Sequence, residues 1–107
     1  MKVGDYVRTK YGSIRKIINL ETYCNLIIET DKGDLLKDNI VKASSNIIDL
    51  IEVGDYVNGE CVINVDSIEA YTKDGMYLNE DIKSIVTKEQ FSQMEYRIGE
   101  WLYAIVG

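Results

Sequence analysis

The pentapeptide Val-Gly-Asp-Tyr-Val occurs twice in this chain, at residues 3–7 and again at residues 53–57. A weaker match follows each copy, because residues 36–40 (LKDNI) resemble residues 78–82 (LNEDI). The first pair is offset by 50 positions and the second by 42, so the second copy is shorter by about eight residues. We expect loops to absorb this difference. An internal repeat of this kind predicts a chain built from two copies of one small unit.

Each copy has the pattern of short strands separated by turns. Residues 31–34 (DKGD) and 72–75 (TKDG) are hairpin-turn signals at corresponding places in the two copies. The segment after the first of these turns favours a tight turn or one turn of 3-10 helix before a last strand. Alternation along the first strand predicts that Val3 and Val7 point inward and that Tyr6 points outward. Such short, closely spaced strands predict a mainly β chain that forms small barrels or sandwiches.

One short α-helix is predicted near residues 87–95. Thr87 is a natural N-cap, and Gln90 completes the T-x-x-Q capping box. Phe91 and Met94 lie three residues apart and form an apolar stripe. We expect this stripe to pack across an open barrel end, with a partner-binding surface as the alternative.

The repeat also predicts the organisation of the chain. The first β repeat spans residues 1–46, and residues 47–52 form an apolar, packed connector. The second β repeat spans residues 53–107 and includes the helix and a C-terminal hairpin that turns at residues 99–100. Residues 101–106 are apolar on both faces, which favours a buried strand or, alternatively, a sheet edge or dimer contact.

The composition excludes several kinds of active site. The chain has no histidine, and its two cysteines, Cys24 and Cys61, lack the CxxC spacing. The usual zinc sites and the Ser-His and Cys-His nucleophile pairs are therefore excluded. No apolar run approaches the length of a membrane-spanning helix, and the start lacks the apolar stretch of a signal peptide. We therefore expect a cytoplasmic protein that is not an enzyme, does not associate with membranes and carries no cofactor.

Charge is divided unevenly between the two halves of the chain. Residues 1–50 carry eight basic and seven acidic residues, whereas residues 51–107 carry four basic and eleven acidic ones. A candidate basic and aromatic loop in the first repeat comprises Tyr6, Arg8, Lys10, Tyr11, Arg15 and Lys16. A candidate acidic partner surface in the second repeat comprises Asp55, Glu60, Asp66, Glu69, Asp74, Glu80 and Asp81. The alternative for both sets is ordinary solvated surface charge.

Two resemblances to known proteins are carried by specific segments. The pattern of SH3-like barrels is similar to three segments of this chain: residues 2–7 (KVGDYV), the Tyr11-Gly12 turn, and Leu36 followed by Asn39-Ile40. Residues 44–57 and 80–91 resemble short uncharacterised accessory proteins of phages and prophages in clostridia and their relatives. The first resemblance implies two tandem small SH3-like barrels, a fold that hosts many functions. The second implies an accessory protein made inside an infected or lysogenic bacterial cell.

These features together predict a non-enzymatic interaction protein of the anti-defence type, which inhibits or modulates a host macromolecule. Its acidic surface would imitate phosphate charge and engage a host protein that itself binds nucleic acid. One alternative is nucleic-acid binding by the basic and aromatic loop, in which cations neutralise phosphates and tyrosines stack on bases. A second alternative is a sponge that sequesters a small nucleotide. A homodimer is a further alternative for the assembly.

Overall fold

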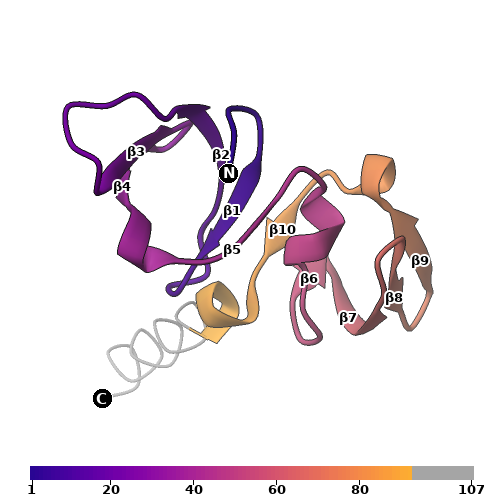
Figure 1. Cartoon of the computed structure of the whole chain (residues 1–107). Helices are drawn as coiled ribbons and strands as arrows, with labels where there is room; N and C mark the ends of the chain where they lie inside the picture. Colours follow the sequence, from indigo (N-terminus) through magenta and orange to yellow (C-terminus); the bar gives the residue numbers. More distant parts are fainter. Residues whose placement is uncertain (93–107) are drawn as a thin grey trace, which may run out of the picture.

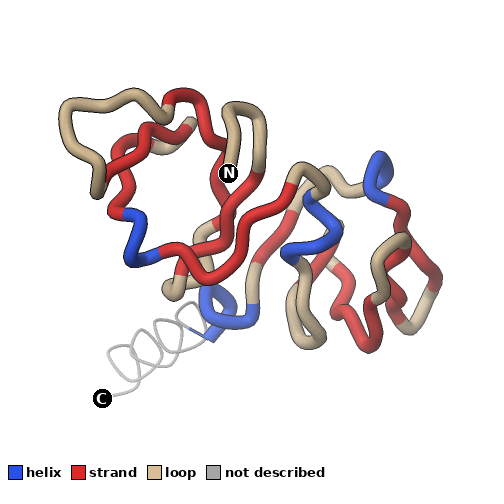
Figure 2. Tube along the Cα trace, in the orientation of Figure 1, coloured by secondary structure: helices blue, strands red, loops and turns tan. Residues whose placement is uncertain are grey.

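The computed structural model describes residues 1–92, which form two five-stranded antiparallel sheets and the start of one helix (Figures 1 and 2). Each sheet curls into a small barrel-like unit, and the two units lie side by side with the helix below the junction in Figure 1. The prediction of a mainly β fold with two SH3-like repeats and a short capped helix is confirmed. The predicted C-terminal hairpin, the predicted apolar strand 101–106 and Met94 lie outside the described residues.

The two sheets have the same topology. The first, called the first barrel below, has the order β4-β3-β2-β1-β5, and the second barrel has the order β10-β6-β7-β8-β9. In each, four strands follow one another as a meander, and the last strand returns beside the first after one turn of 3-10 helix. The first barrel comprises β1 (Tyr6–Thr9), β2 (Ile14–Asn19), β3 (Ile27–Thr30), β4 (Gly33–Leu36), η1 (Lys37–Asn39) and β5 (Ile40–Ser44). The second comprises β6 (Tyr56–Val57), β7 (Glu60–Val65), β8 (Glu69–Thr72), β9 (Gly75–Leu78), η3 (Asn79–Asp81) and β10 (Ile85–Val86).

The repeated pentapeptide forms the same turn at the entrance of each barrel. The amide of Asp5 donates to the carbonyl of Lys2 at 3.1 Å, and Gly4 between them has a φ of 95°. This is the glycine position of a type II turn, where other residues are strained. Asp55 and Glu52 make the same bond at 3.1 Å around a glycine with a φ of 98°. Each aspartate carboxylate also accepts the amide hydrogen of the first turn residue, so the repeated Gly-Asp encodes a closed turn.

The two valines inside these turns correct one expectation. Val3 is 58% exposed and its counterpart Val53 is 54% exposed, so the prediction that Val3 points inward is wrong. Both valines lie in the turn that precedes the strand, where alternation between two faces does not apply. Alternation holds once β1 has begun, because Val7 is buried in the barrel and Tyr6 is half-buried on the other face.

Each barrel has its own core, and the strand registers show which residues occupy equivalent positions in the two cores. Val62 is the counterpart of Ile17, and Ala70 is the counterpart of Ile28. The second core therefore has smaller side chains at these two positions. The first core consists of Val7, Ile17, Ile28 and Leu35, and the second of Ile48, Ile51, Val57, Val62 and Ala70.

The connector contributes two side chains to the second core. It forms η2 (Ile47–Leu50), and Ile48 and Ile51 from this segment belong to the second core with exposures of 2% and 3%. Leu50 is fully buried as well. The connector is thus a structural part of the second barrel and not a free linker between the barrels.

The difference in length between the copies is divided among the first strand, which has four residues in β1 and two in β6, and two loops. The β1–β2 loop covers residues 10–13, whereas the β6–β7 loop is the two-residue turn 58–59 with φ values of 51° and 84°. Positive φ at both positions is the type I′ geometry that Asn-Gly favours. The β2–β3 loop covers residues 20–26, against residues 66–68 in the second barrel. The longer β1–β2 loop allows the first barrel to reach the helix.

The helix begins at Lys88, and its described part reaches Ser92. The amide of Thr87 donates to the Gln90 side chain at 3.1 Å, and the amide of Gln90 donates to the Thr87 hydroxyl at 3.4 Å. These reciprocal bonds confirm the predicted capping box. Phe91 packs on the second barrel and is 38% exposed. No helix within the described residues is long and apolar enough to cross a membrane.

Candidate functional site

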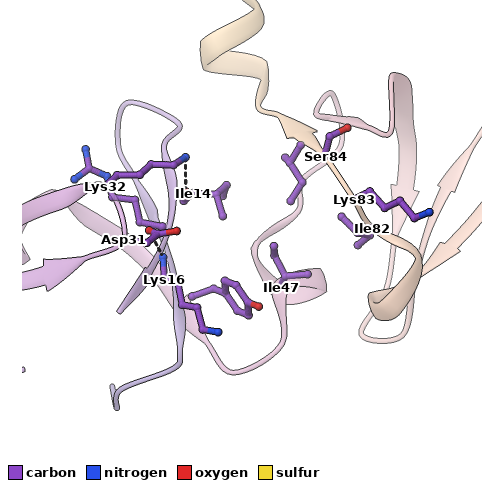
Figure 3. Close-up of a pocket in the computed structure, with 11 residues that line it drawn as sticks. Ile14, Lys16, Asp31, Lys32, Ile47, Ile82, Lys83 and Ser84 are labelled. Atoms are coloured by element: carbon purple, nitrogen blue, oxygen red, sulfur yellow. Dashed lines mark hydrogen bonds between the residues drawn. The ribbon is translucent and has the colours of Figure 1, made fainter. Parts of the chain in front are cut away.

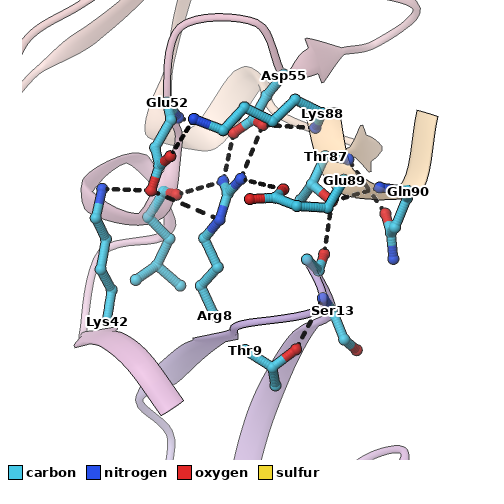
Figure 4. Close-up of polar contacts among 12 residues, drawn as sticks. Arg8, Thr9, Ser13, Lys42, Glu52, Asp55, Thr87, Lys88, Glu89 and Gln90 are labelled. Carbon is cyan, nitrogen blue, oxygen red and sulfur yellow. Dashed lines mark hydrogen bonds and ion pairs between the residues drawn. The ribbon is translucent and has the colours of Figure 1, made fainter. Parts of the chain in front are cut away.

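A buried arginine joins the two barrels. Arg8 points away from the core of the first barrel, as expected for the neighbour of Val7 on β1, yet its exposed fraction is 1%. The second barrel and the start of the helix cover this face of β1 (Figure 4). A buried guanidinium is costly unless its charge and its N–H groups are satisfied.

The partners of Arg8 come from three different segments. Nη1 and Nη2 donate to both carboxylate oxygens of Asp55, which is itself fully buried, and the Nη2–Oδ1 distance is 3.0 Å. Nη1 also donates to the carbonyl of Leu50 at 2.9 Å, and Nη2 donates to Glu89 at 2.8 Å. Bidentate pairing of this kind is among the strongest polar contacts in proteins. One side chain of the first barrel therefore holds the connector, the entrance of the second barrel and the helix.

Further charged side chains surround the Arg8–Asp55 pair, and the positive and negative charges of the whole group are equal in number. Glu52 lies 3.7 Å from Arg8 Nε and accepts from Lys42 at 2.9 Å and from Lys88 at 2.7 Å. The backbone amide of Lys88 donates to Asp55 at 2.9 Å. We call this set the inter-barrel ion network: it contains three cations and three carboxylates, namely Arg8, Lys42, Lys88, Glu52, Asp55 and Glu89.

The network shifts the pKa values of its members. Burial lowers the pKa of Arg8, but the hydrogen bonds and charge of Asp55, with Glu52 and Glu89, outweigh burial and raise it above the ordinary value. The hydrogen bond from Lys88 lowers the pKa of Glu52 from 4.5 to about 2 against the effect of burial, with further contributions from Lys42 and Arg8. Both groups are therefore held in their charged forms.

The low pKa of Glu52 predicts a specific loss of stability in acid. Its folded-state pKa lies below its unfolded value, so its stabilisation is complete above pH 4.5 and is lost as the pH falls toward 2. Glu52→Gln should lower the free energy of unfolding by about 1–2 kcal/mol at pH 7 and flatten its decline below pH 4.5. Urea denaturation across this pH range measures both effects. Glu21→Gln, at an exposed loop carboxylate, is the control, and the same flattening in both variants would contradict the assignment.

The β1–β2 loop makes a second contact between the first barrel and the helix. The Thr87 hydroxyl donates to the carbonyl of Gly12 at 2.8 Å, and both residues are buried. Gly12 has a φ of 85°, and a Cβ atom at this position would lie 2.2 Å from Thr87 Oγ1. A side chain at position 12 would therefore collide with the helix N-cap. This contact and the ion network fix the barrels at the same junction (Figure 4).

A cleft of about 310 Å³ lies between the two barrels (Figure 3). Four isoleucines contribute apolar surface: Ile14 from β2, Ile47 from η2, Ile82 before β10 and Ile85 in β10. Tyr6 from β1 adds an aromatic ring. The volume falls in the range of small-molecule sites, which combine apolar walls with a few polar groups.

Positive charge lines the first-barrel wall of this cleft. Arg15 and Lys16 come from β2, and Lys32 from the β3–β4 turn donates to the carbonyl of Ile14 at 2.9 Å. One carboxylate, Asp31, also lines the cleft and accepts the amide hydrogen of Lys16 at 2.9 Å. Within residues 1–92 the ion pairs use other cations, so these three have no carboxylate partner there. Lys83 also lines the cleft, but it extends away from the first barrel in Figure 3.

The predicted basic and aromatic loop is divided among three environments. Tyr6, Arg15 and Lys16 line the cleft. Lys10 and Tyr11 are exposed on the β1–β2 loop, where the ammonium lies 5.7 Å from the ring centroid. Arg8 is buried in the ion network, which corrects its assignment to a binding surface. Lys32 and the four isoleucines were missed. Strand pairing within the first barrel brings Lys32 and Ile14 near Tyr6, and the packing of the two barrels adds Ile47, Ile82 and Ile85.

The predicted acidic surface keeps six of its seven members accessible. Asp55 is the exception, because it is buried against Arg8 and cannot meet an external partner. Asp66 accepts the backbone amides of Ile68 and Glu69, which lower its pKa and assign it a role in the β7–β8 turn. Accessible members on the second barrel are Glu60, Asp66, Glu69, Asp74, Glu80 and Asp81.

Comparisons with known proteins add no assignment. No protein-family model matches the chain, and no curated protein or solved structure matches it. Among residues 1–92, no group of three or more Cys, Asp or Glu side chains is placed to hold a metal ion.

Proposed function

We propose that this protein is a non-enzymatic interaction protein that binds an anionic partner in the cleft between its two barrels. The observation that carries the proposal is the set of three cations, Arg15, Lys16 and Lys32, without carboxylate partners around one cleft. The chain has a net charge of −6, so three cations gathered around one cleft contrast with its overall charge. Clustered cations on a concave surface attract anions and raise their association rate.

The junction between the barrels supports this role. The two walls of the cleft come from different barrels, so its shape depends on how the barrels are held. The ion network and the Thr87–Gly12 bond hold them through buried contacts that involve Arg8, Asp55 and Glu89. A site whose walls are fixed before binding loses less entropy when a ligand arrives.

A charge-reversal pair tests the proposal. Lys32→Glu should weaken binding of a fluorescein-labelled abasic phosphodiester decamer by about tenfold at low salt, because a cation beside the phosphates is lost. Lys73 lies in the corresponding hairpin turn of the second barrel, outside the cleft, so Lys73→Glu changes the net charge equally. Fluorescence anisotropy gives both affinities. Equal weakening in the two variants, or no binding by the natural protein, would contradict the proposal.

The role in a phage-infected cell and the inhibition of a host protein stay predictions. The six accessible acidic residues of the second barrel remain available for a basic partner, and Glu80 and Asp81 line a separate open hollow beside Met76 and Tyr77. Retention of one host protein from nuclease-treated bacterial lysate would favour this second candidate. Its complex should weaken steeply as salt is raised, because exposed charges are screened.

A further inference from the structure

The two tyrosines of the repeated pentapeptide have different surroundings. Tyr56 on β6 stacks on Phe91 of the helix, with ring centroids 4.5 Å apart and an interplanar angle of 27°. Tyr6 is its counterpart on β1, and no aromatic ring of residues 1–92 stacks on it. Tyr6 lines the cleft between the barrels instead. The second barrel therefore shows that a planar ring can stack on this position of the repeat, and in the first barrel the equivalent position faces the cleft.

The charges beside Tyr6 indicate what kind of planar group would bind. The Lys16 ammonium lies over the Tyr6 ring at 5.9 Å from its centroid, and Arg15 and Lys32 line the same wall. A ligand with a planar ring and an adjacent anion would meet both features at once. Apolar contact with Ile47 and Ile82 on the opposite wall would cover the second face of the ring.

From this juxtaposition we infer that the cleft binds a nucleotide unit, with the base against Tyr6 and the phosphate at Lys16, Arg15 and Lys32. This inference rests on the proposed function, because it names the class of the anionic partner. Aromatic stacking combined with phosphate neutralisation is the way in which proteins bind unpaired nucleotides. A free nucleotide and one unit of a single strand present the same chemistry to the cleft.

The test compares two decamers that differ only in their bases. A thymidine decamer should bind about tenfold more tightly than the abasic phosphodiester decamer, because only the former can stack. Tyr6→Leu should make the affinities for the two decamers equal, whereas Tyr6→Phe should retain the preference for the thymidine decamer. Thermal denaturation of each variant verifies that it is folded. Competition with thymidine 5′-monophosphate distinguishes the two sources. An inhibition constant equal to the dissociation constant of the thymidine decamer indicates a free nucleotide. Displacement by longer strands alone indicates a single strand.

The outcomes separate this inference from the proposed function. Equal affinity for the two decamers, with Lys32→Glu still weakening both, would overturn the nucleotide assignment and leave anion binding in place. A thymidine preference that survives in Tyr6→Leu would also overturn it, since the base would then bind elsewhere. Failure of the natural protein to bind either decamer would overturn the proposed function as well.

Discussion

Asp55→Asn should destabilise the protein by about 3–5 kcal/mol, the usual consequence of removing one partner of a buried ion pair. Asp55 is fully buried and makes both bonds of the bidentate contact with Arg8. The amide side chain is neutral and presents its NH2 group toward a guanidinium that has only donors. Urea denaturation at pH 7 measures the loss. A free energy of unfolding of about 5–15 kcal/mol is typical of small proteins, so this change removes a large share of it.

The repeat itself supplies the control. Asp5 occupies the same position of the same turn and accepts the amide hydrogen of Lys2, but it is not an Arg8 partner. Asp5→Asn should therefore cost less than about 1 kcal/mol, because the Asn side-chain oxygen can still accept the amide hydrogen of Lys2. Arg8→Met should reduce the additional effect of Asp55→Asn, because coupled residues do not contribute additively. Equal losses at Asp5 and Asp55, or full additivity with Arg8→Met, would contradict the role of the network.

Gly12→Ala should destabilise the protein by about 2–5 kcal/mol, for two separate reasons. The first is the φ of 85°, since a left-handed conformation costs a non-glycine residue about 1–2 kcal/mol. The second is the collision of the new methyl group with Thr87 Oγ1 at 2.2 Å and with Glu89 Cβ at 2.9 Å, which adds about 1–3 kcal/mol of overpacking. Displacing the helix N-terminus would also break the bond from Thr87 to the Gly12 carbonyl.

Gly33→Ala isolates the contribution of the collision. Gly33 has a φ of 107°, and a Cβ atom there would have no neighbour within 4 Å. This variant should lose only the stability that the left-handed conformation costs a non-glycine residue. Hydrogen exchange of the Phe91 amide, which donates to Thr87, should accelerate in Gly12→Ala and not in Gly33→Ala. Equal stability of the two variants would show that the loop does not press on the helix.

The local elements of the fold were predictable because their signals lie within a few residues. The repeated pentapeptide located both barrel entrances, the Gly-containing turns located both hairpins, and Thr87 with Gln90 located the helix start. The inward orientation of Val3 was predicted wrongly, since alternation was extended one turn too early. The place of Ile48 and Ile51 in the second core was not anticipated, because it depends on how the connector packs against the second barrel.

The candidate site was less accessible to prediction, because it depends on how the barrels pack. The sequence indicated that Arg8 and Asp55 belong to surfaces of opposite charge, and each was assigned to an external partner. The structure shows that these two charges neutralise each other across a separation of 47 residues. Opposite charges on two repeats of one chain were a signal that the repeats contact each other. These charges were instead assigned to binding other molecules. The cleft residues Tyr6, Arg15 and Lys16 were identified, but the opposite wall was not.

The central claim is that the cleft between the barrels is the binding site, and an NMR titration tests it most directly. Backbone amide signals of the ¹⁵N-labelled protein would be followed while sodium pyrophosphate is added at constant ionic strength. We expect saturable shifts at Lys16, Lys32 and Ser84, which line the cleft from both barrels, and none at Lys73 in the hairpin turn outside it. Shifts that do not saturate, or that are as large at Lys73 as at Lys32, would contradict the assignment of the cleft as the site.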